Sequence, residues 1–382
     1  MKEKRFMKLL GILALCTICL WGMGEMKSKS QAKVKARTET ECLYEKALRA
    51  HFKGWGHLGK SGHCYYAYAK HSYSNRKNEI MIVGLQDTVK EIKIPEKIKG
   101  KKVTVIHLLS LGEITNGTTL EKLLNTKPAE SKTQSITIPR YVEEISLDSF
   151  QQEEFLVNLK KFRVSPKNKH FKSKAGVLFT KNGKMLLKYP NKRKVSKYRI
   201  PDGVKELSTQ SFERARVERI TMPNTVKRIN YWAFSDAHVK KISLSKNLNF
   251  IGWAAFSRSD LREITIPGTV KTIPKSCFSS CNKLKKVTFK DGVKKVSDGA
   301  FVQSYGLRKL IIPASVKKIE DLFFIDPIDN EKKEEGTENA LEKDKEAWRK
   351  AGVTVYAKKG SYAYRKFTGK WLKKQGFKVK VM

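Results

Sequence analysis

The sequence predicts a solenoid, a stack of short repeated units that form a narrow parallel β-sheet, and three observations lead to this fold class. A phenylalanine recurs every 22 or 23 residues, at Phe212, Phe234, Phe256, Phe278, Phe301 and Phe324. Other apolar residues recur with it at fixed positions of each unit, and every unit contains a short stretch in which apolar and polar residues alternate. A fixed period of this length is typical of stacked repeats.

A single unit cannot fold alone. The six apolar side chains of one unit stabilise the fold by roughly 1.5–3 kcal/mol each when buried. Ordering the unit's backbone and side chains costs about 1.5 kcal/mol per residue, which is on the order of 30 kcal/mol for one repeat. Neighbouring units must therefore cover each other's open faces.

The stretch LREITIP, residues 261–267, predicts the strand of each unit. Ile264 and Ile266 face one side of this strand, while Glu263 and Thr265 face the other. The same frame recurs as VERITMP, VKKISLS, LKKVTFK and LRKLIIP. Proline ends the strand because it lacks a backbone donor; it occurs at Pro201, Pro223, Pro267 and Pro313.

The repeated frame L-x-x-I-x-I-P-x-x-V-x-x-I-x-x-x-x-F resembles the BspA-type leucine-rich repeat of bacterial surface and secreted proteins. Earlier units follow the same frame at Ile92–Leu111 and Ile136–Phe150, so the resemblance extends the repeats over residues 92–324. It implies a leucine-rich-repeat solenoid of the α/β repeat type. It also implies a role in adhesion to host matrix proteins and to neighbouring cells.

Three stretches depart from the period. Asn182 and Gly183 separate two apolar runs within residues 168–190, and this predicts an inserted β-hairpin because both residues tolerate positive φ. Residues 116–134 are polar and predict a loop. Residues 325–352 carry dense charges of both signs and predict a helical or disordered insertion.

Residues 353–382 predict a strand–helix–strand cap at the C-terminal end of the stack. The strands are VTVYA and FKVKV, and SYAYRKFTGKWLKKQ between them predicts the helix. Ser361 suits the N-cap of this helix, and Gly376 suits its stop. A cap is required because the last repeat would otherwise expose its core.

Residues 1–36 have the pattern of a signal peptide: a basic start, the apolar run Leu9–Gly24, and then polar sequence. The run is shorter than the roughly 20 residues that a bilayer span requires, and an uncleaved anchor is the alternative. We expect cleavage after Ala32 or Ala36, no transmembrane segment in the remaining chain, and a secreted or cell-surface location. Residues 37–91 would then form the N-terminal cap region.

Four cysteines follow the predicted leader. An oxidising exterior permits a disulfide between Cys42 and Cys64. Cys277 and Cys281 occupy repeat positions where small buried residues are expected.

Neither a metal site nor an active site is predicted. The histidines near Cys64 match no compact zinc-ligand spacing; they are His51, His57, His63 and His71. Cys64 could be a nucleophile, but no partner residues can be identified for it. Phosphate-binding loops, paired catalytic carboxylates and serine elbows are all missing from the sequence. We therefore expect no enzymatic activity and no cofactor.

The charge of the chain predicts anionic partners. The formal net charge is +42, and removing residues 1–36, which hold eight Lys or Arg and two acidic residues, leaves +36. Such a field attracts polyanions with an affinity that falls as salt rises. The expected partners are host or bacterial surface proteins, or anionic polysaccharide and teichoic acid. Nucleic acid would bind only nonspecifically, through its phosphates.

Strand alternation predicts a basic stripe along the concave sheet. Its outward positions are Lys161, Arg219, Lys241, Glu263, Lys286 and Lys309, flanked by Arg163, Thr221, Ser243, Thr265 and Thr288. The stripe has two interpretations, a solvated face that keeps the sheet soluble and an electrostatic binding strip. Tyr231 and Trp253 occupy equivalent positions of consecutive repeats and predict neighbouring aromatic rings, which would either bind sugar or pack beneath adjacent loops.

Taken together, these features predict an exported, noncatalytic, monomeric solenoid that mediates macromolecular binding or adhesion at the cell surface through its basic concave face. The alternative is a structural envelope protein that charge alone holds on anionic wall polymers, without a specific host partner.

Overall fold

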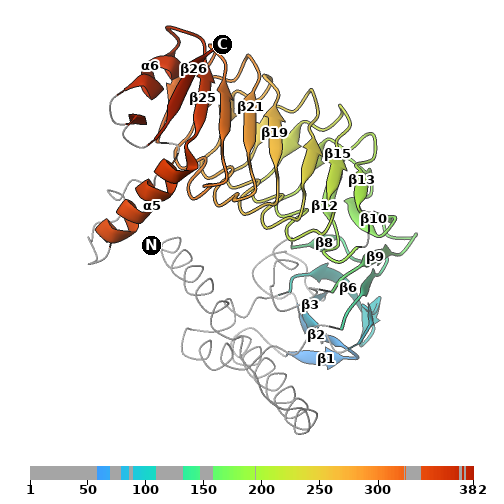
Figure 1. Ribbon diagram of the computed structural model, residues 1–382. Coiled ribbons are helices and arrows are strands. Elements are labelled where there is room, and N and C mark those ends of the chain that lie inside the picture. Colours follow the sequence, from blue (N-terminus) through green and yellow to red (C-terminus); the bar gives the residue numbers. More distant parts are fainter. Residues whose placement is uncertain are drawn as a thin grey trace.

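The computed structural model describes the repeat stack and parts of both its ends. The described residues are 58–68, 79–85, 89–108, 132–146, 158–193, 195–321, 323, 337–369, 372–373 and 376–382. The predicted leader, Cys42 and residues 116–131 of the predicted loop lie outside these ranges. In the C-terminal two thirds of the chain, the strands of successive repeats follow one another in sequence order within each of two rows, as a leucine-rich-repeat solenoid requires (Figure 1).

One strand of each unit contributes to a narrow parallel sheet, here called the first sheet, and this confirms the predicted fold class. It has three hydrogen-bonded segments, all parallel. They are β4 (Glu91–Lys93), β7 (Ser135–Ile138) and β9 (Lys161–Val164); β13 (Lys197–Arg199), β15 (Arg219–Thr221) and β17 (Lys241–Ser243); and β19 (Glu263–Ile266), β21 (Lys286–Phe289), β23 (Lys309–Ile312), β25 (Thr354–Ala357) and β26 (Lys378–Val381).

A second row of parallel strands, here called the second sheet, was not predicted. Each unit contributes only two residues to it, from the V-x-x-I part of the frame, so no alternation is visible in the sequence. Its strands are β14 (Glu206–Leu207), β16 (Arg228–Ile229), β18 (Phe250–Ile251), β20 (Thr272–Ile273), β22 (Lys295–Val296) and β24 (Lys318–Ile319). Each strand buries its second residue and turns its first residue outward.

Stacked phenylalanine rings run through the core, which confirms the basis of the repeat. The centroids of Phe234 and Phe256 are 5.2 Å apart with an interplanar angle of 4°, and those of Phe256 and Phe278 are 5.5 Å apart. On the C-terminal side of Phe301, the next stacked ring is Phe323, with centroids 6.0 Å apart. The predicted Phe324 lies outside the described residues, so the described stack continues one residue earlier than the sequence alignment placed it.

The inserted hairpin is present and joins the second sheet. Strands β10 (Phe171–Lys174), β11 (Val177–Thr180) and β12 (Met185–Lys188) pair antiparallel, and β12 then pairs parallel with β14. Gly183 takes a φ of 72°, and the Asn182 Oδ1 atom accepts a hydrogen bond from the Lys184 N–H at 2.9 Å. The Asn-Gly signal was therefore a sound predictor of this turn.

The N-terminal end of the stack uses antiparallel pairing. Strands β1 (Gly59–Ser61), β2 (Cys64–Tyr68) and β3 (Ile80–Leu85) form an antiparallel meander. β3 continues in parallel to β6 (Lys101–Ile106), which also pairs with β5 (Lys97–Ile98) and β8 (Glu144–Ile145). All six residues of β3 are buried, so this strand packs on both faces.

The C-terminal end contains two helices, α5 (Thr337–Ala351) and α6 (Tyr362–Thr368), besides strands β25 and β26. The Ser361 Oγ atom accepts a hydrogen bond from the Tyr364 N–H at 3.2 Å, which makes Ser361 the N-cap of α6. α6 ends at Thr368 with Gly369 as its C-cap. Leu372 and Lys373 are helical again, and Gly376 follows them with a φ of 82° and donates its N–H to the Lys373 carbonyl at 3.0 Å, as expected of a helix stop. Within the described part of the chain, no helix has the length and apolar character needed to cross a membrane.

Candidate binding surface

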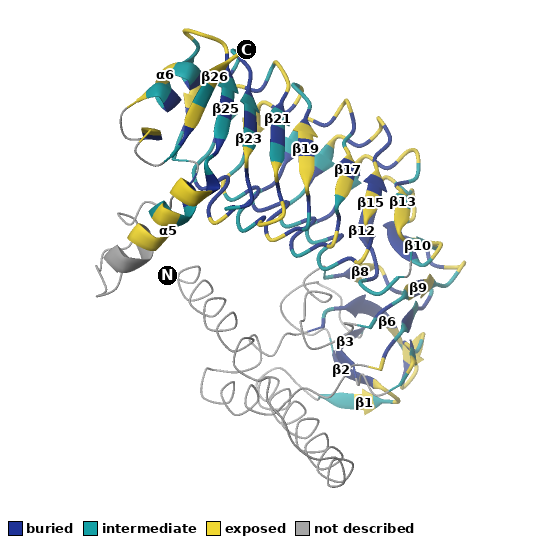
Figure 2. Ribbon diagram, viewed as in Figure 1, coloured by how far each residue is buried: buried dark blue, intermediate teal, exposed yellow. Residues whose placement is uncertain are grey.

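The outward side chains of the first sheet lie in register from strand to strand. Arg219 pairs with Lys241 across β15 and β17, and Glu263, Lys286 and Lys309 pair in line across β19, β21 and β23. Residues between them along each strand, such as Ile220 and Ile264, are buried. Figure 2 shows the resulting change from exposed to buried positions along these strands. The alternation predicted from sequence therefore holds for this stripe.

Lys161 and Arg163 belong to a separate segment of the first sheet. Their strand, β9, pairs with β7 on one side, and the Phe162 N–H donates to the Gly176 carbonyl of the inserted hairpin at 2.8 Å. Arg163 forms an ion pair with Glu91 and donates to the Ser135 Oγ atom at 3.4 Å. The hairpin thus interrupts the predicted stripe, and Arg163 already has an acidic partner.

Several cationic residues that sequence reasoning missed extend this surface. Lys197 pairs with Arg219 at one end, and Lys378 pairs with Thr354 of β25 at the other end. A further column lies directly before the strands, where successive backbones are hydrogen-bonded; its cationic members are Lys240, Arg262, Lys285 and Arg308. This column could have been predicted from the sequence, because the repeat frame places a polar residue just before each outward stripe position.

The acidic residues of the stack mostly bind cations on adjacent rungs. Glu218 accepts a hydrogen bond from the Lys240 Nζ atom at 2.5 Å, and this bond lowers the pKa of Glu218. Asp260 lies between His238, at 3.1 Å, and Lys283, at 2.9 Å. Burial opposes ionisation of Asp260, but the hydrogen bonds from Lys283 and His238 lower its pKa overall.

The stripe lysines differ from those cations. In the described part of the molecule, no ion pair joins Lys241, Lys286 or Lys309 to an acidic side chain. The Lys309 Nζ atom instead lies 4.5 Å from the centroid of the Tyr356 ring, within the range of a cation–π contact. Positive charge on the first sheet is therefore left to interact with solvent or with a partner.

Tyr231 and Trp253 lie on adjacent rungs, but each ring packs against a different neighbour. The Trp253 ring makes an edge contact with Trp232, with centroids 4.5 Å apart. The Tyr231 ring makes an edge contact with Phe250 at 6.2 Å, and the Arg228 guanidinium lies 3.9 Å from the Phe250 centroid. Tyr231 remains 46% exposed, so it is the accessible ring of this group.

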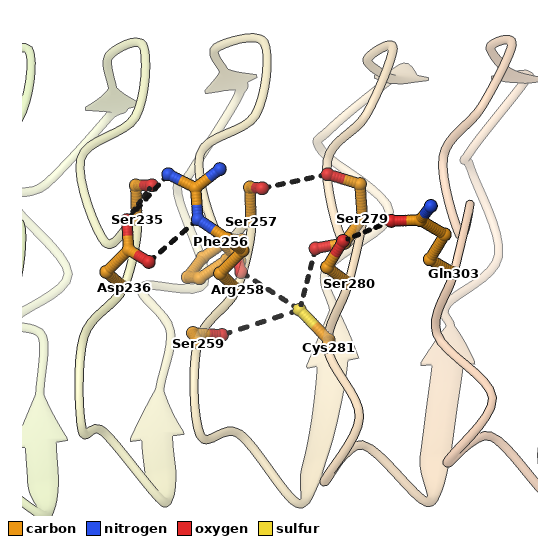
Figure 3. Close-up of polar contacts among 10 residues, drawn as sticks. All are labelled: Ser235, Asp236, Phe256, Ser257, Arg258, Ser259, Ser279, Ser280, Cys281 and Gln303. Atoms are coloured by element: carbon orange, nitrogen blue, oxygen red, sulfur yellow. Dashed lines mark hydrogen bonds and ion pairs between the residues drawn. The ribbon is translucent and has the colours of Figure 1, made fainter. Parts of the chain in front are cut away.

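A ladder of polar contacts joins the turns that carry the phenylalanines, and it is structural. Arg258 forms two hydrogen bonds with the Asp236 carboxylate, at 2.7 and 2.8 Å, and the hydroxyls of Ser257 and Ser279 lie 2.8 Å apart (Figure 3). Asp236 and Arg258 both take a φ of 55°, which is unfavourable for residues other than glycine. These side-chain bonds between rungs help to hold such turns in place.

The three cysteines in the described part of the chain are buried. Burial raises the pKa of the Cys64 thiol to about 12, which disfavours the nucleophilic thiolate. Its predicted disulfide partner, Cys42, lies outside the described residues, so that bridge stays a prediction. Cys277 and Cys281 are buried and unbridged, and the Cys281 thiol donates to the Phe256 carbonyl. Among the described residues, no group of three His, Cys, Asp or Glu side chains could hold a metal ion; His51, His57 and His71 lie outside them.

Comparison with known families identifies the repeats. Residues 192–328 match the model of the BspA type leucine rich repeat region in six copies. This part of the chain is a BspA-type leucine-rich-repeat region, as its residue frame predicted. Proteins of this type are surface or secreted proteins with binding or adhesion roles, and the family is typically noncatalytic.

Solved bacterial structures are similar to the chain. A leucine-rich repeat protein from Eubacterium ventriosum ATCC 27560 has 23% identity and a TM-score of 0.49, and the match covers 61% of this chain but only 57% of that one. The pneumococcal vaccine antigen PcpA has 16% identity and a TM-score of 0.45, over 86% of this chain and 99% of that one. A leucine rich cell surface protein from Faecalibacterium prausnitzii A2-165 has 16% identity and a TM-score of 0.36, over 69% and 94%. A search of curated proteins found no match.

Proposed function

We propose that this protein is an exported, noncatalytic leucine-rich-repeat protein that binds macromolecules at the cell surface through the outward side chains of its first sheet. The proposal rests on a contrast between two sets of cations on the same rungs. Lys240 and Lys283 form ion pairs with acidic side chains, whereas Lys241, Lys286 and Lys309 form no ion pair among the described residues, although Glu263 is the cross-strand neighbour of Lys286. A row of unmatched charge in register favours an extended anionic partner.

The partner classes are a host or bacterial surface protein with an acidic face, or an anionic polysaccharide or teichoic acid. The apolar leader in residues 1–36 supports export. We further propose that the protein acts as a monomer, since stacking within one chain already covers the repeat faces.

A charge-reversal variant tests the first sheet. Lys241, Lys286 and Lys309 are changed together to Glu, and the matched control changes three exposed lysines elsewhere to Glu, namely Lys97, Lys167 and Lys358. We expect adhesion of the first variant to matrix-coated surfaces to fall at least tenfold below the control. Equal behaviour of the two variants would contradict the proposal, because net charge alone would then explain binding.

The rival function is a structural envelope protein held by charge without a specific partner. Its support is the net charge of +42. Extraction of cells at rising salt separates the two functions, because purely electrostatic retention is screened. Complete release at moderate salt, together with no adhesion of the purified protein to host matrix, would favour the structural role.

A further inference from the structure

A second basic row lies outside the first sheet, at the corner where the chain enters each strand of the second sheet. One exposed residue per rung occupies this corner, directly after the buried Val or Leu that precedes the strand or, in the inserted hairpin, directly after Gly183. We call these residues the corner row: Lys184, Lys205, Lys227, Asn249, Lys271, Lys294 and Lys317. Six of the seven are lysines, and none is an arginine.

Backbone hydrogen bonds keep the corner row in register within each of its two halves, Lys184 to Asn249 and Lys271 to Lys317. The Lys205 N–H donates to the Lys184 carbonyl at 2.7 Å, and the Lys227 N–H donates to the Lys205 carbonyl at 2.7 Å. In the later rungs, the Lys294 N–H donates to the Lys271 carbonyl, and the Lys317 N–H to the Lys294 carbonyl, both at 2.8 Å. With rungs about 4.8 Å apart, the whole row is roughly 29 Å long.

The acidic side chain at the C-terminal end of the row is engaged by other cations. Glu320 binds Lys295 at 2.7 Å and Lys318 at 3.2 Å, and these two lysines lie on the strands directly after the corner row. The Lys271 Nζ atom contacts only the backbone carbonyls of Gly268, at 3.0 Å, and Gly292, at 3.4 Å. Within the described residues, no ion pair involves a corner-row lysine.

Repulsion between the corner-row lysines destabilises the free protein. Two unit charges about 5 Å apart in water repel by roughly 0.8 kcal/mol before salt screening. The in-register stacking repeats this repulsion along the row, and a polyanion lying along it would relieve the repulsion at each rung.

We propose that the corner row is a docking surface for one linear phosphodiester polymer of the teichoic type, lying parallel to the solenoid axis. The row has one residue per rung, and the flanking Lys295 and Lys318 are bound by Glu320, so the unpaired charge forms a narrow line that suits a single chain and not a duplex. Lysine supplies point charges without the fixed fork that arginine offers to a defined anion. No aromatic side chain belongs to the row, so it lacks the stacking platforms that single-stranded nucleic acids and sugar rings use.

This docking surface goes beyond the proposed binding by the first sheet and does not depend on it. The two rows belong to different sheets, and their lysines can be changed separately. A protein with both rows could be held on wall polymer by the corner row while its first sheet contacts another macromolecule.

The test measures the affinity of the full-length protein for purified poly(glycerol phosphate) as salt is varied. The test variant changes all six corner-row lysines to Gln. The control variant also loses six positive charges, through Gln at exposed lysines outside both rows: Lys97, Lys167, Lys169, Lys290, Lys358 and Lys359. Gln keeps these exposed positions polar, and thermal unfolding of both variants checks that the stack is intact.

We expect the corner-row variant to lose roughly 100-fold in affinity, and its plot of log affinity against log salt to become shallower by about 4, since each phosphate contact contributes about 0.7 to the slope. The control should lose less than tenfold. The affinity of wild type should also rise with polymer length until the polymer spans the row. Equal losses of affinity in the corner-row and control variants would overturn the proposal. It would also be overturned if heparin or oligothymidylate bound wild type at least as tightly as poly(glycerol phosphate) and lost that affinity in the corner-row variant.

The Lys241, Lys286 and Lys309 variant separates this inference from the proposed function. It should keep its affinity for poly(glycerol phosphate) within about fivefold. If it loses the polymer while the corner-row variant retains it, the first sheet is the polymer site and the corner-row proposal is wrong. If it loses adhesion but keeps the polymer, both proposals stand.

Discussion

The middle of the stack and its C-terminal end bury the same kind of ring in different ways. In the middle, Phe256 lies between two nearly parallel phenylalanine rings, Phe234 and Phe278, from equivalent positions of the adjacent units. At the end, Phe323 has Phe301 on one side, and on the other it meets Trp348 at 4.8 Å and Phe377 at 4.4 Å. Those two residues belong to α5 and to the chain just before β26.

This difference shows that a repeated sequence specifies the packing between its units but not the packing that covers the ends of the stack. An interior unit is complementary to a copy of itself, so one frame serves every rung. The terminal unit has no copy beyond it, and its ring must be covered by side chains outside the frame. The angles reflect this, because Phe256 stacks at 4° and 9° on its neighbours whereas Trp348 meets Phe323 at 64°.

Truncating an interior ring should have the largest effect. We expect Phe256→Ala to lower the free energy of unfolding by about 3–5 kcal/mol, because it removes a fully buried ring and leaves a cavity between two stacked rings. Chemical denaturation followed by circular dichroism measures this change. Tyr231→Ala, at the exposed ring, is the control and should change stability by less than about 1 kcal/mol. Similar losses in the two variants would contradict the self-complementary stack.

Truncating the ring that covers the end should have a smaller and more local effect. We expect Trp348→Ala to cost up to about 3 kcal/mol, with faster hydrogen exchange in β23 and β24 but little change in β15 and β16. Hydrogen exchange resolved along the sequence measures this gradient. Uniform loss of protection over all rungs would show that the end is not an independent cover.

The smallest expected effect concerns a charge contact between rungs near the end. Hydrogen bonds from Lys295 and Lys318 lower the pKa of Glu320 in the folded protein, although partial burial opposes them. A depressed folded-state pKa stabilises the fold above the ordinary Glu pKa of about 4.3. That contribution is lost as pH falls through the lower folded-state value.

Glu320→Gln should therefore destabilise the protein by less than about 1 kcal/mol at pH 7, since the contact is partly exposed, and the difference from wild type should shrink below pH 4. Denaturation midpoints at pH 7 and pH 3 measure it. The control is Glu206→Gln, at the first position of β14, because Glu206 forms no ion pair among the described residues. An equally large pH dependence in the control would count against the contact.

Much of the fold could be predicted because adjacent rungs share one residue pattern, so the pattern within one unit also indicates how that unit packs on the next. In LREITIP, the burial of Ile264 and Ile266 follows from alternation, and the partner rung has the same pattern 23 residues later. The hairpin at Gly183 was predictable because its turn is local. The stacking of Phe323 on Phe301 was not predicted, because the repeat frame assigns the phenylalanine position of this unit to Phe324, which lies outside the described residues.

The candidate surfaces were less predictable than the fold. The outward positions of the first sheet follow from alternation. The ion pair that neutralises Arg163, however, joins it to Glu91, 72 positions earlier in the sequence, and the strands of these two residues are neighbours only through β7. Likewise, Trp253 packs on Trp232 and Tyr231 on Phe250, which no repeat alignment specifies. The corner row was overlooked because its two-residue strands leave no alternation in the sequence.

By itself, the sequence determined that this protein stacks repeats, which residues of each repeat are apolar enough to be buried, and that the chain carries a large positive charge. These properties depend on composition and period, which need no knowledge of contacts between distant residues. Only the tertiary structure decided which cations are matched by acids, which remain unmatched, and how two sheets divide them into separate rows. Ion pairing depends on distances of a few ångströms between side chains of different rungs, and folding alone sets those distances.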